Sequence, residues 1–324
     1  MTYDYTQDLL KFIQRSPSPY HTVQASRIYL DQAGFQALAL SETWHLAPNS
    51  AYYVPLYDSG LVAFRTGSDV RRHLRLSAAH TDFPCLRLKY RPELRQHGYL
   101  KLNAEVYGGL LRESWLDRPL SLAGTVALQS KDAFRPEVRL IDIGRPVLTI
   151  PRLAIHMNRQ ANDGVALNPQ KDLLPVMGLD DQALTNHFFL DFLSEKCHCL
   201  PEAILSYDLT VYPCETGCSL GWHDEFISSP RLDNLTSVLA CLMGLVKEDR
   251  ADGLNVTALF DNEEVGSQTK QGADSQILPG ILRRIYHAFG FTDDDFSADL
   301  GRAFMLSVDV AHAIHPNEIG RAHV

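Results

Sequence analysis

The chain has 324 residues, of which 45% are hydrophobic and 21% are charged, and this length can bury a sizeable core in about two domains. The formal net charge of −9 and the lack of a lysine- and arginine-rich run argue against nucleic acid as a partner. No stretch has the roughly 18–20 apolar residues that span a bilayer, and we expect neither a secretory signal nor a membrane anchor. The six cysteines are few and unevenly spaced, which indicates reduced thiols in a cytoplasmic protein.

The first part of the chain has an α/β pattern. Helical apolar spacing over residues 8–13 ends at a Ser-Pro-Ser-Pro run, and a second helix is expected over about 20–33, before Gly34. Short apolar runs that are typical of strands follow at residues 52–54, 60–64 and 74–79. This alternation indicates the beginning of a sheet covered by helices.

The middle of the chain has a different pattern. From about Cys85 to Gly217 many short β-like runs are separated by turn residues, with a helix expected only over about 180–193. We therefore expect a β-rich unit at residues 85–217, inserted between the two parts of an α/β domain at residues 1–84 and 218–317.

After Pro230 the α/β pattern returns. It predicts a helix over 233–246, a buried strand over 255–260, a helix over 276–289 and a buried strand over 303–308. Such alternation is typical of a mostly parallel sheet with helices on both faces.

Residues that can bind metal ions follow three of the predicted strands. These residues, together with an acidic residue that opens a predicted helix, are His80 and Asp82, Asp261 with Glu263 and Glu264, Asp309, and Asp233. In open α/β sheets the site lies beyond the carboxyl ends of the strands, so distant segments can meet there. One imidazole and several carboxylates suit a pair of divalent ions, and in a Glu-Glu pair one carboxylate can bind metal while the other moves protons.

Each of these residues also has an ordinary structural interpretation. A His-x-Asp sequence can be a loop hydrogen bond, and Asp233-Asn234 can cap a helix. The two glutamates can be a solvated pair, and Asp309 can cap a turn. Predicted apolar strands are repeatedly followed by acidic residues, and this pattern favours a metal site. The spacing alone leaves both interpretations open.

Several segments resemble motifs of the M18 aminopeptidases, in the family's order. They are His80-Thr-Asp82-Phe-Pro84, Val106-Tyr-Gly-Gly109, Trp115-Leu-Asp-Arg118, Ile150-Pro-Arg-Leu-Ala-Ile-His156, Ser229-Pro-Arg-Leu-Asp233-Asn234, Asp261-Asn-Glu-Glu-Val-Gly-Ser267, and Ser307-Val-Asp309 with His315-Pro-Asn317. The resemblance implies a zinc metallopeptidase domain interrupted by an inserted dimerisation domain at residues 85–217. It also implies a cytoplasmic homo-oligomer, from dimer to dodecamer, that acts on peptides.

The resemblance also implies roles for individual residues. His80 and Asp309 would bind one metal ion, Asp233 would bridge two ions, and Glu264 would bind the second. Glu263 would be the general base, and Asp82 would orient His80. Two Zn²⁺ per subunit are expected, with Co²⁺ or Mn²⁺ as alternatives. For His156, in the inserted domain, substrate contact is expected before metal binding.

The family pattern continues past Asn317 and includes a further metal-binding histidine. We therefore expect the sequence to be truncated, with residues 318–324 a non-native tail and with little or no activity in the chain as given.

The function implied is removal of the N-terminal residue of a peptide, with Asp or Glu as the first expectation for that residue. Alternatives are another two-metal amidohydrolase, of the deacylase or carboxypeptidase-like kind, and a non-catalytic assembly subunit. Turnover of peptides against acyl-amino acids would separate the two enzymes. Metal analysis would separate the subunit, which need not bind two ions.

Overall fold

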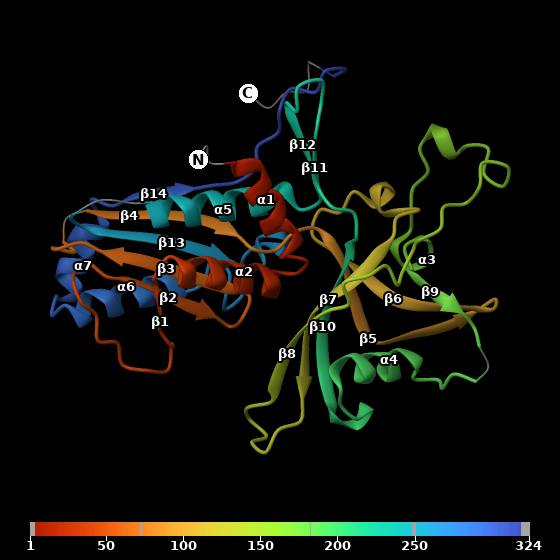
Figure 1. Ribbon diagram of the computed structural model, residues 1–324, viewed down its shortest axis with the longest axis horizontal. Helices are drawn as coiled ribbons and strands as arrows, with labels where there is room; N and C mark the ends of the chain where they lie inside the picture. Colours follow the sequence, from red (N-terminus) through yellow and green to blue (C-terminus); the bar gives the residue numbers. More distant parts are fainter. Residues whose placement is uncertain (1–3, 72, 182, 248–250, 319–324) are drawn as a thin grey trace. The chain divides into compact units, whose positions relative to one another are not determined.

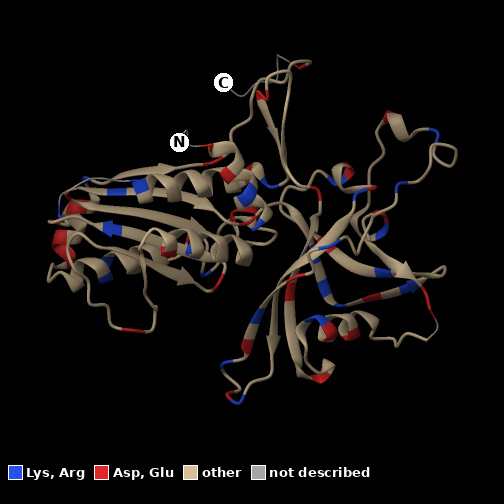
Figure 2. Cartoon of the chain, viewed as in Figure 1, with Lys and Arg blue, Asp and Glu red and all other residues tan. Residues whose placement is uncertain are grey.

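The computed structural model describes residues 4–71, 73–181, 183–247 and 251–318, so most of the tail expected at residues 318–324 lies outside the described residues. The chain forms two compact units (Figure 1). The first contains residues 1–13, 22–82 and 231–324, and the second contains residues 14–21 and 83–230. Among the described residues, no helix is long and apolar enough to span a bilayer. Acidic and basic side chains are interspersed along the ribbon (Figure 2).

The first unit is built on a six-stranded sheet. In spatial order its strands are β1 (Gln36–Ala37), β2 (Ala51–Leu56), β3 (Gly60–Thr66), β13 (Leu254–Phe260), β4 (Leu74–His80) and β14 (Phe304–Ser307). Three of the five pairings are parallel and two are antiparallel. The antiparallel pair β2–β3 is a hairpin whose turn residues, Tyr57 and Asp58, both have positive φ, which matches the twist of the strands. The predicted α/β sheet is confirmed, with this hairpin as an addition.

Helices cover both faces of this sheet, as expected. They are α1 (Tyr5–Gln14), α2 (Pro19–Gln32), α5 (Leu232–Lys247), α6 (Ile277–Ala288) and α7 (Asp293–Leu300). On one face α6 and α7 pack into the apolar core with alternate residues of the strands. On the other face the Thr257 hydroxyl donates to the Cys241 carbonyl of α5 (3.4 Å), and the Tyr53 hydroxyl donates to Asp31 of α2 (2.8 Å).

Strand β14 differs from its prediction. The sequence predicted a buried strand over 303–308, but all four residues of β14 are exposed, with Phe304 at 65%. The prediction is wrong because β14 is an edge strand that pairs with β4 alone in the described part of the chain. The apolar composition of β14 is therefore not evidence that its side chains are buried.

The second unit contains an antiparallel sheet. Its strands, in spatial order, are β8 (Glu137–Asp142), β7 (Leu120–Leu128), β10 (Ile204–Pro213), β5 (Cys85–Gln96), β6 (Tyr99–Tyr107) and β9 (Val176–Leu179). Helix α4 (Phe188–Cys197) adds Phe188, Phe189 and Leu193 to its core, and α3 (Pro169–Asp172) is a single turn. A separate hairpin consists of β11 (Cys218–Leu220) and β12 (Phe226–Ser228). The role of residues 85–217 as an inserted dimerisation domain remains a prediction.

A buried carboxylate fixes α7 in the first unit. Asp299 is fully buried and accepts hydrogen bonds from Arg71 Nε (2.9 Å), Arg302 (2.6 Å) and the Tyr286 hydroxyl (3.1 Å). Because a buried carboxylate is stable only when it is paired and hydrogen-bonded, these donors are a condition for this packing.

The change Asp299→Ala is expected to lower the free energy of unfolding by about 3 kcal/mol, because it leaves buried donors unpaired. The control Asp293→Ala removes an exposed carboxylate that lies, like Asp299, on α7 and is paired with His287 of α6. It should lower the free energy of unfolding by about 1 kcal/mol or less. Urea unfolding measures both. Equal losses would contradict the importance of Asp299.

His21, near the start of α2, belongs to the second unit and is half-buried, and the Ser18 hydroxyl is 2.8 Å from its Nδ1. Burial lowers the pKa of His21 from 6.5 to about 4, although the charge of Asp142 opposes this. The folded state therefore favours the neutral ring, and its contribution to stability is present above pH 6.5 and is lost as the pH falls to about 4.

When the pH falls from 7 to 4, the free energy of unfolding should decrease in the wild-type chain by about 3 kcal/mol more than it does in His21→Gln. Urea unfolding at a series of pH values gives the difference. His45→Gln, at an exposed histidine, should keep the wild-type profile. Parallel profiles for the wild type and His21→Gln would disprove the role of His21.

Candidate metal centre

The ends of the strands bring the predicted site residues of the first unit to one edge of the sheet. His80 is the last residue of β4 and pairs in register with Phe260, the last residue of β13. Glu263 and Glu264 lie in the short turn after β13, and Asp309 follows β14. Because β13, β4 and β14 are parallel, their carboxyl ends meet there (Figure 1).

The imidazole of His80 is surrounded by carboxylates. Its Nε2 lies 3.4 Å from Asp233 Oδ1 and 3.7 Å from Asp309 Oδ1. Glu263 Oε2 is 3.8 Å from the same nitrogen. Within the described residues, His80, Asp233 and Asp309 form a group whose potential ligand atoms all lie within 4.8 Å of one another. One imidazole and two carboxylates in this arrangement fit a divalent metal ion.

Asp82 holds the site together from behind His80. Its side chain is fully buried, and Oδ1 lies 3.2 Å from His80 Nδ1. The same carboxylate accepts hydrogen bonds from the backbone N–H groups of Glu263 (3.2 Å) and Glu264 (3.1 Å). Asp82 therefore favours a proton on Nδ1, which leaves Nε2 of a neutral ring to face the carboxylates.

The electrostatics of the centre favour a cation. Burial lowers the pKa of His80, but the hydrogen bond and charge of Asp82 and the charges of Glu263 and Asp233 raise it, with a net value of about 9. Burial also raises the pKa of Asp233, and the nearby carboxylate of Asp309 raises it further while His80 lowers it. The carboxylates therefore stabilise positive charge at this position.

Not every acidic residue at the strand ends joins the group. Asp261, directly after β13, is buried, and its Oδ1 accepts a hydrogen bond from the backbone N–H of Asn262 (2.7 Å). Burial raises the pKa of Asp261 to about 6. This bond makes it a support of the turn and not part of the metal-ligand group.

Two asparagines support the site and were missed from the sequence. Asn262 adopts φ +64°, and its Oδ1 accepts from the Thr269 hydroxyl (2.8 Å), which orders the turn that presents the glutamates. Asn234, which follows a cis peptide bond from Asp233, donates from Nδ2 to the Val308 carbonyl (3.0 Å). Only for Asn262 did the residue type give a clue in the sequence, because asparagine adopts the left-handed backbone conformation more readily than most other residues do.

Two predicted residues stand apart from the group of ligands. Glu264 contributes its backbone N–H to Asp82, but its carboxylate is not among the grouped ligand atoms. His156 lies in an exposed turn of the second unit. The roles of both side chains stay predictions.

Comparisons with known proteins identify the family of the chain. The model of the M18 peptidase family, described as aminopeptidase I zinc metalloprotease, matches residues 12–319. A protein of *Clostridium acetobutylicum* named probable M18 family aminopeptidase 2 is 43% identical over 319 residues, which are 97% of this chain and 74% of that protein.

Two solved structures are also similar. Ape4, from its complex with Nbr1, has a TM-score of 0.92 at 33% identity, and *Chaetomium thermophilum* mApe1 has a TM-score of 0.89 at 29% identity. This chain is covered to 98% in both cases, and it spans 65% of the Ape4 chain and 76% of the mApe1 chain. From the family match of its sequence and the similarity of its fold, the chain belongs to the M18 family of zinc metalloproteases, as a member of the aminopeptidase type.

Proposed function

We propose that this chain provides the metal centre of an enzyme that removes the N-terminal residue from peptides. The observation that carries the proposal is the Nε2 of His80 facing the carboxylates of Asp233, Asp309 and Glu263 within 3.4–3.8 Å. The names of the relatives favour an aminopeptidase over a deacylase, a carboxypeptidase-like enzyme or a non-catalytic assembly subunit.

The proposed centre holds two Zn²⁺ ions, with Co²⁺ or Mn²⁺ as substitutes. His80 and Asp309 would hold the first ion, Asp233 would be shared by both, and Glu264 would hold the second. The grouping of the first three residues supports this assignment, and the position of Glu264 in the turn beside Asp82 is compatible with it. When bound, the ions lower the pKa of a water molecule and polarise the scissile carbonyl.

Glu263 is the proposed general base. It takes a proton from the attacking water and then gives a proton to the leaving amine. Its carboxylate is half-exposed beside His80, while its backbone N–H is fixed by Asp82. This combination supports the role, because the side chain can reach substrate and its starting position is defined. Asp82 orients His80 and holds the turn.

The substrate and the surroundings of the enzyme are proposed from the family resemblance. We propose an acidic N-terminal residue, Asp or Glu, as the preferred substrate residue, and contact between His156 and the substrate. None of the six cysteines, all within the described residues, forms a disulfide, which supports a cytoplasmic location. The structure of *Saccharomyces cerevisiae* mApe1, which shares the fold at 24% identity, is described as a dodecamer. We propose that this protein also forms a homo-oligomer.

The change Asp82→Asn is expected to weaken zinc binding about 10- to 100-fold, because it removes the charge that orients His80 and the acceptor that holds both glutamate N–H groups. A competition titration of the metal-free chain with a zinc-binding dye measures this affinity. Asp252→Asn, at an exposed carboxylate beside His73, should leave it unchanged. Equal affinities of all three proteins would contradict the role of Asp82.

The change Glu263→Gln should reduce turnover about 10²- to 10⁴-fold while zinc content stays the same, because only proton transfer is lost. The assay compares substrates with acidic and neutral N-terminal residues, in a preparation with measurable peptidase activity. Glu195→Gln, at an exposed residue of α4, is the matched control. If Glu263→Gln retained more than about a tenth of the rate, another base would have to act.

A further inference from the structure

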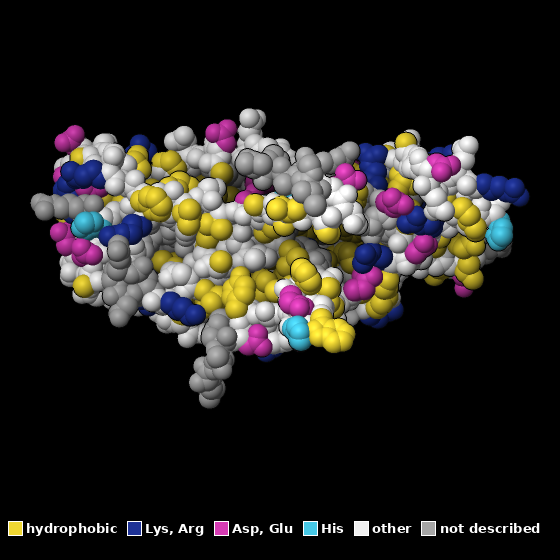
Figure 3. All heavy atoms as spheres, turned by 90° about the horizontal axis from the view of Figure 1, so that it is seen from above, with side chains coloured by type: hydrophobic (Ala, Val, Ile, Leu, Met, Phe, Trp, Pro, Cys, Tyr) yellow, Lys and Arg dark blue, Asp and Glu magenta, His cyan; other side chains and the backbone are white. Residues whose placement is uncertain are grey.

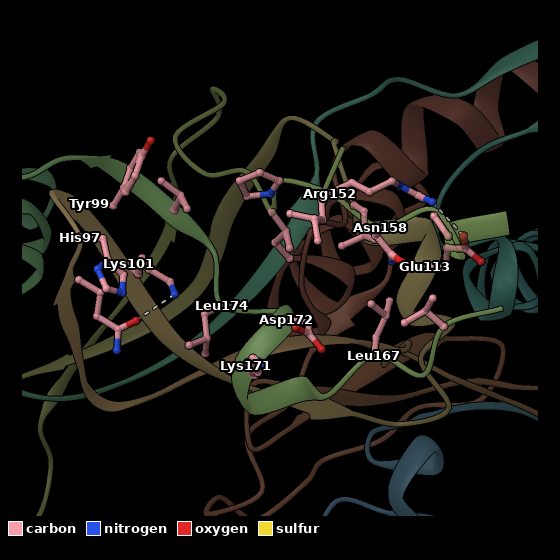
Figure 4. Close-up of a pocket in the computed structure, with 18 residues that line it drawn as sticks. His97, Tyr99, Lys101, Glu113, Arg152, Asn158, Leu167, Lys171, Asp172 and Leu174 are labelled. Atoms are coloured by element: carbon pink, nitrogen blue, oxygen red, sulfur yellow. Dashed lines mark hydrogen bonds and ion pairs between the residues drawn. The ribbon is translucent and has the colours of Figure 1, made fainter. Parts of the chain in front are cut away.

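The second unit contains a cavity of about 570 Å³, a size typical of binding sites for small groups. It lies between β6, β9 and the segment that leads through α3 (Figure 4). Leu116, Ile150, Leu167, Leu174 and Val176 supply apolar walls. The proposed metal centre uses none of these residues, so the cavity is a separate feature.

The charges around the cavity do not balance. The lining has three cations, Lys101, Arg152 and Lys171, and two carboxylates, so one positive charge is in excess. Glu113 forms an ion pair with Arg152 (3.0 Å), and Asp172 accepts from the neutral backbone N–H of Asn168 (2.7 Å). Lys101 bonds only the neutral amide of Gln96 (3.1 Å), and Lys171 has no side-chain partner among the described residues. The cavity is therefore suited to a guest that is apolar and carries negative charge beside it.

Hydrophobic side chains reach the surface in several groups on the face drawn in Figure 3. The hairpin β11–β12 presents the most exposed tryptophan, Trp222, which is 90% exposed, whereas Trp44 and Trp115 are 6% and 7% exposed. Trp222 therefore does not fill the cavity of its own chain. Exposed tryptophans that have a partner are often the strongest contributors to an interface.

The turn that carries Trp222 is ordered and acidic. The Glu225 carboxylate accepts from the backbone N–H of His223 (2.9 Å), and the Trp222 and His223 rings meet edge-on with centroids 6.2 Å apart. At Gly221, with φ +115°, a Cβ would lie 2.3 Å from Glu225 Oε2, so glycine permits this closure. Asp224 is exposed beside them. An aromatic ring on a fixed turn loses little conformational entropy when it binds.

We propose that Trp222 of one copy of this chain inserts into the cavity of a second copy, with Asp224 and Glu225 beside Lys101 and Lys171. The apolar walls receive the indole ring, and the acidic turn matches the excess positive charge. The contact joins two different surfaces of the chain. Two copies can therefore each insert Trp222 into the cavity of the other, or several copies can close into a ring. This inference rests on the proposed self-association and is independent of peptidase chemistry.

The experiment follows association and tryptophan exposure in the same samples. Light scattering gives the mass as the chain is diluted, and acrylamide quenching gives the accessible fraction of tryptophan fluorescence. Because Trp222 is one of three tryptophans and the other two are buried, its fluorescence dominates the quenchable signal. Association should make this signal inaccessible, and dissociation should restore it.

Variants test both sides of the contact. Trp222→Ala should raise the dissociation constant at least about 30-fold, whereas Phe134→Ala, at an equally exposed aromatic residue, should leave it unchanged. Lys171→Glu and Asp224→Lys should each weaken association about tenfold, and their combination should restore part of it. Lys131→Glu, outside the cavity, is the control for charge.

Four results would overturn the inference. Trp222 could remain quenchable in the oligomer, or Trp222→Ala could associate like the wild type. Insensitivity to Lys171→Glu, with no restoration by the paired charge change, would exclude the cavity as the receptor. A chain that stays monomeric at every concentration would also remove the proposed self-association, while zinc binding would still test the metal centre separately.

Discussion

The carboxylate of Asp82 is buried at the point where β4 ends, and the arrangement of the site depends on it. A buried carboxylate needs several hydrogen-bond donors, and here they come from His80 and from the backbone of the turn after β13. The imidazole and the two glutamates therefore cannot be placed independently. A single residue with no expected contact to substrate sets the distance between His80, the proposed metal ligand, and Glu263, the proposed general base.

The carboxylates around His80 also have a cost. Several acidic groups share a small volume next to one imidazole, and without a cation their charges repel one another. The fold maintains this arrangement with neutral links, such as the bond from Asn234 to the Val308 carbonyl. Bound metal ions would relieve the repulsion, so metal binding and stability of this edge of the sheet are expected to be coupled.

Much of the fold and of the ligand group could be predicted from the sequence, for a specific reason. Apolar runs such as 255–260 are short and bounded, and each leads into residues that apolar cores rarely accept. Features that depend on tertiary partners could not be predicted. Asp261 and Glu263 both follow β13, but the sequence does not show that Asp261 is buried and bonded to the backbone of the turn while Glu263 lies beside His80. In the same way, β14 has the composition of a core strand but lies at an edge.

The register of β13 against β4 has a consequence for how the centre can form. The two strands pair without a shift from Leu254–Leu74 to Phe260–His80, and successive side chains point to opposite faces. A slip of one residue would turn His80 to the other face of the sheet and move the glutamate turn along the ladder. No half-assembled version of the centre is compatible with a misregistered sheet, so affinity for a metal ion becomes a measure of whether the central strands have found their correct alignment.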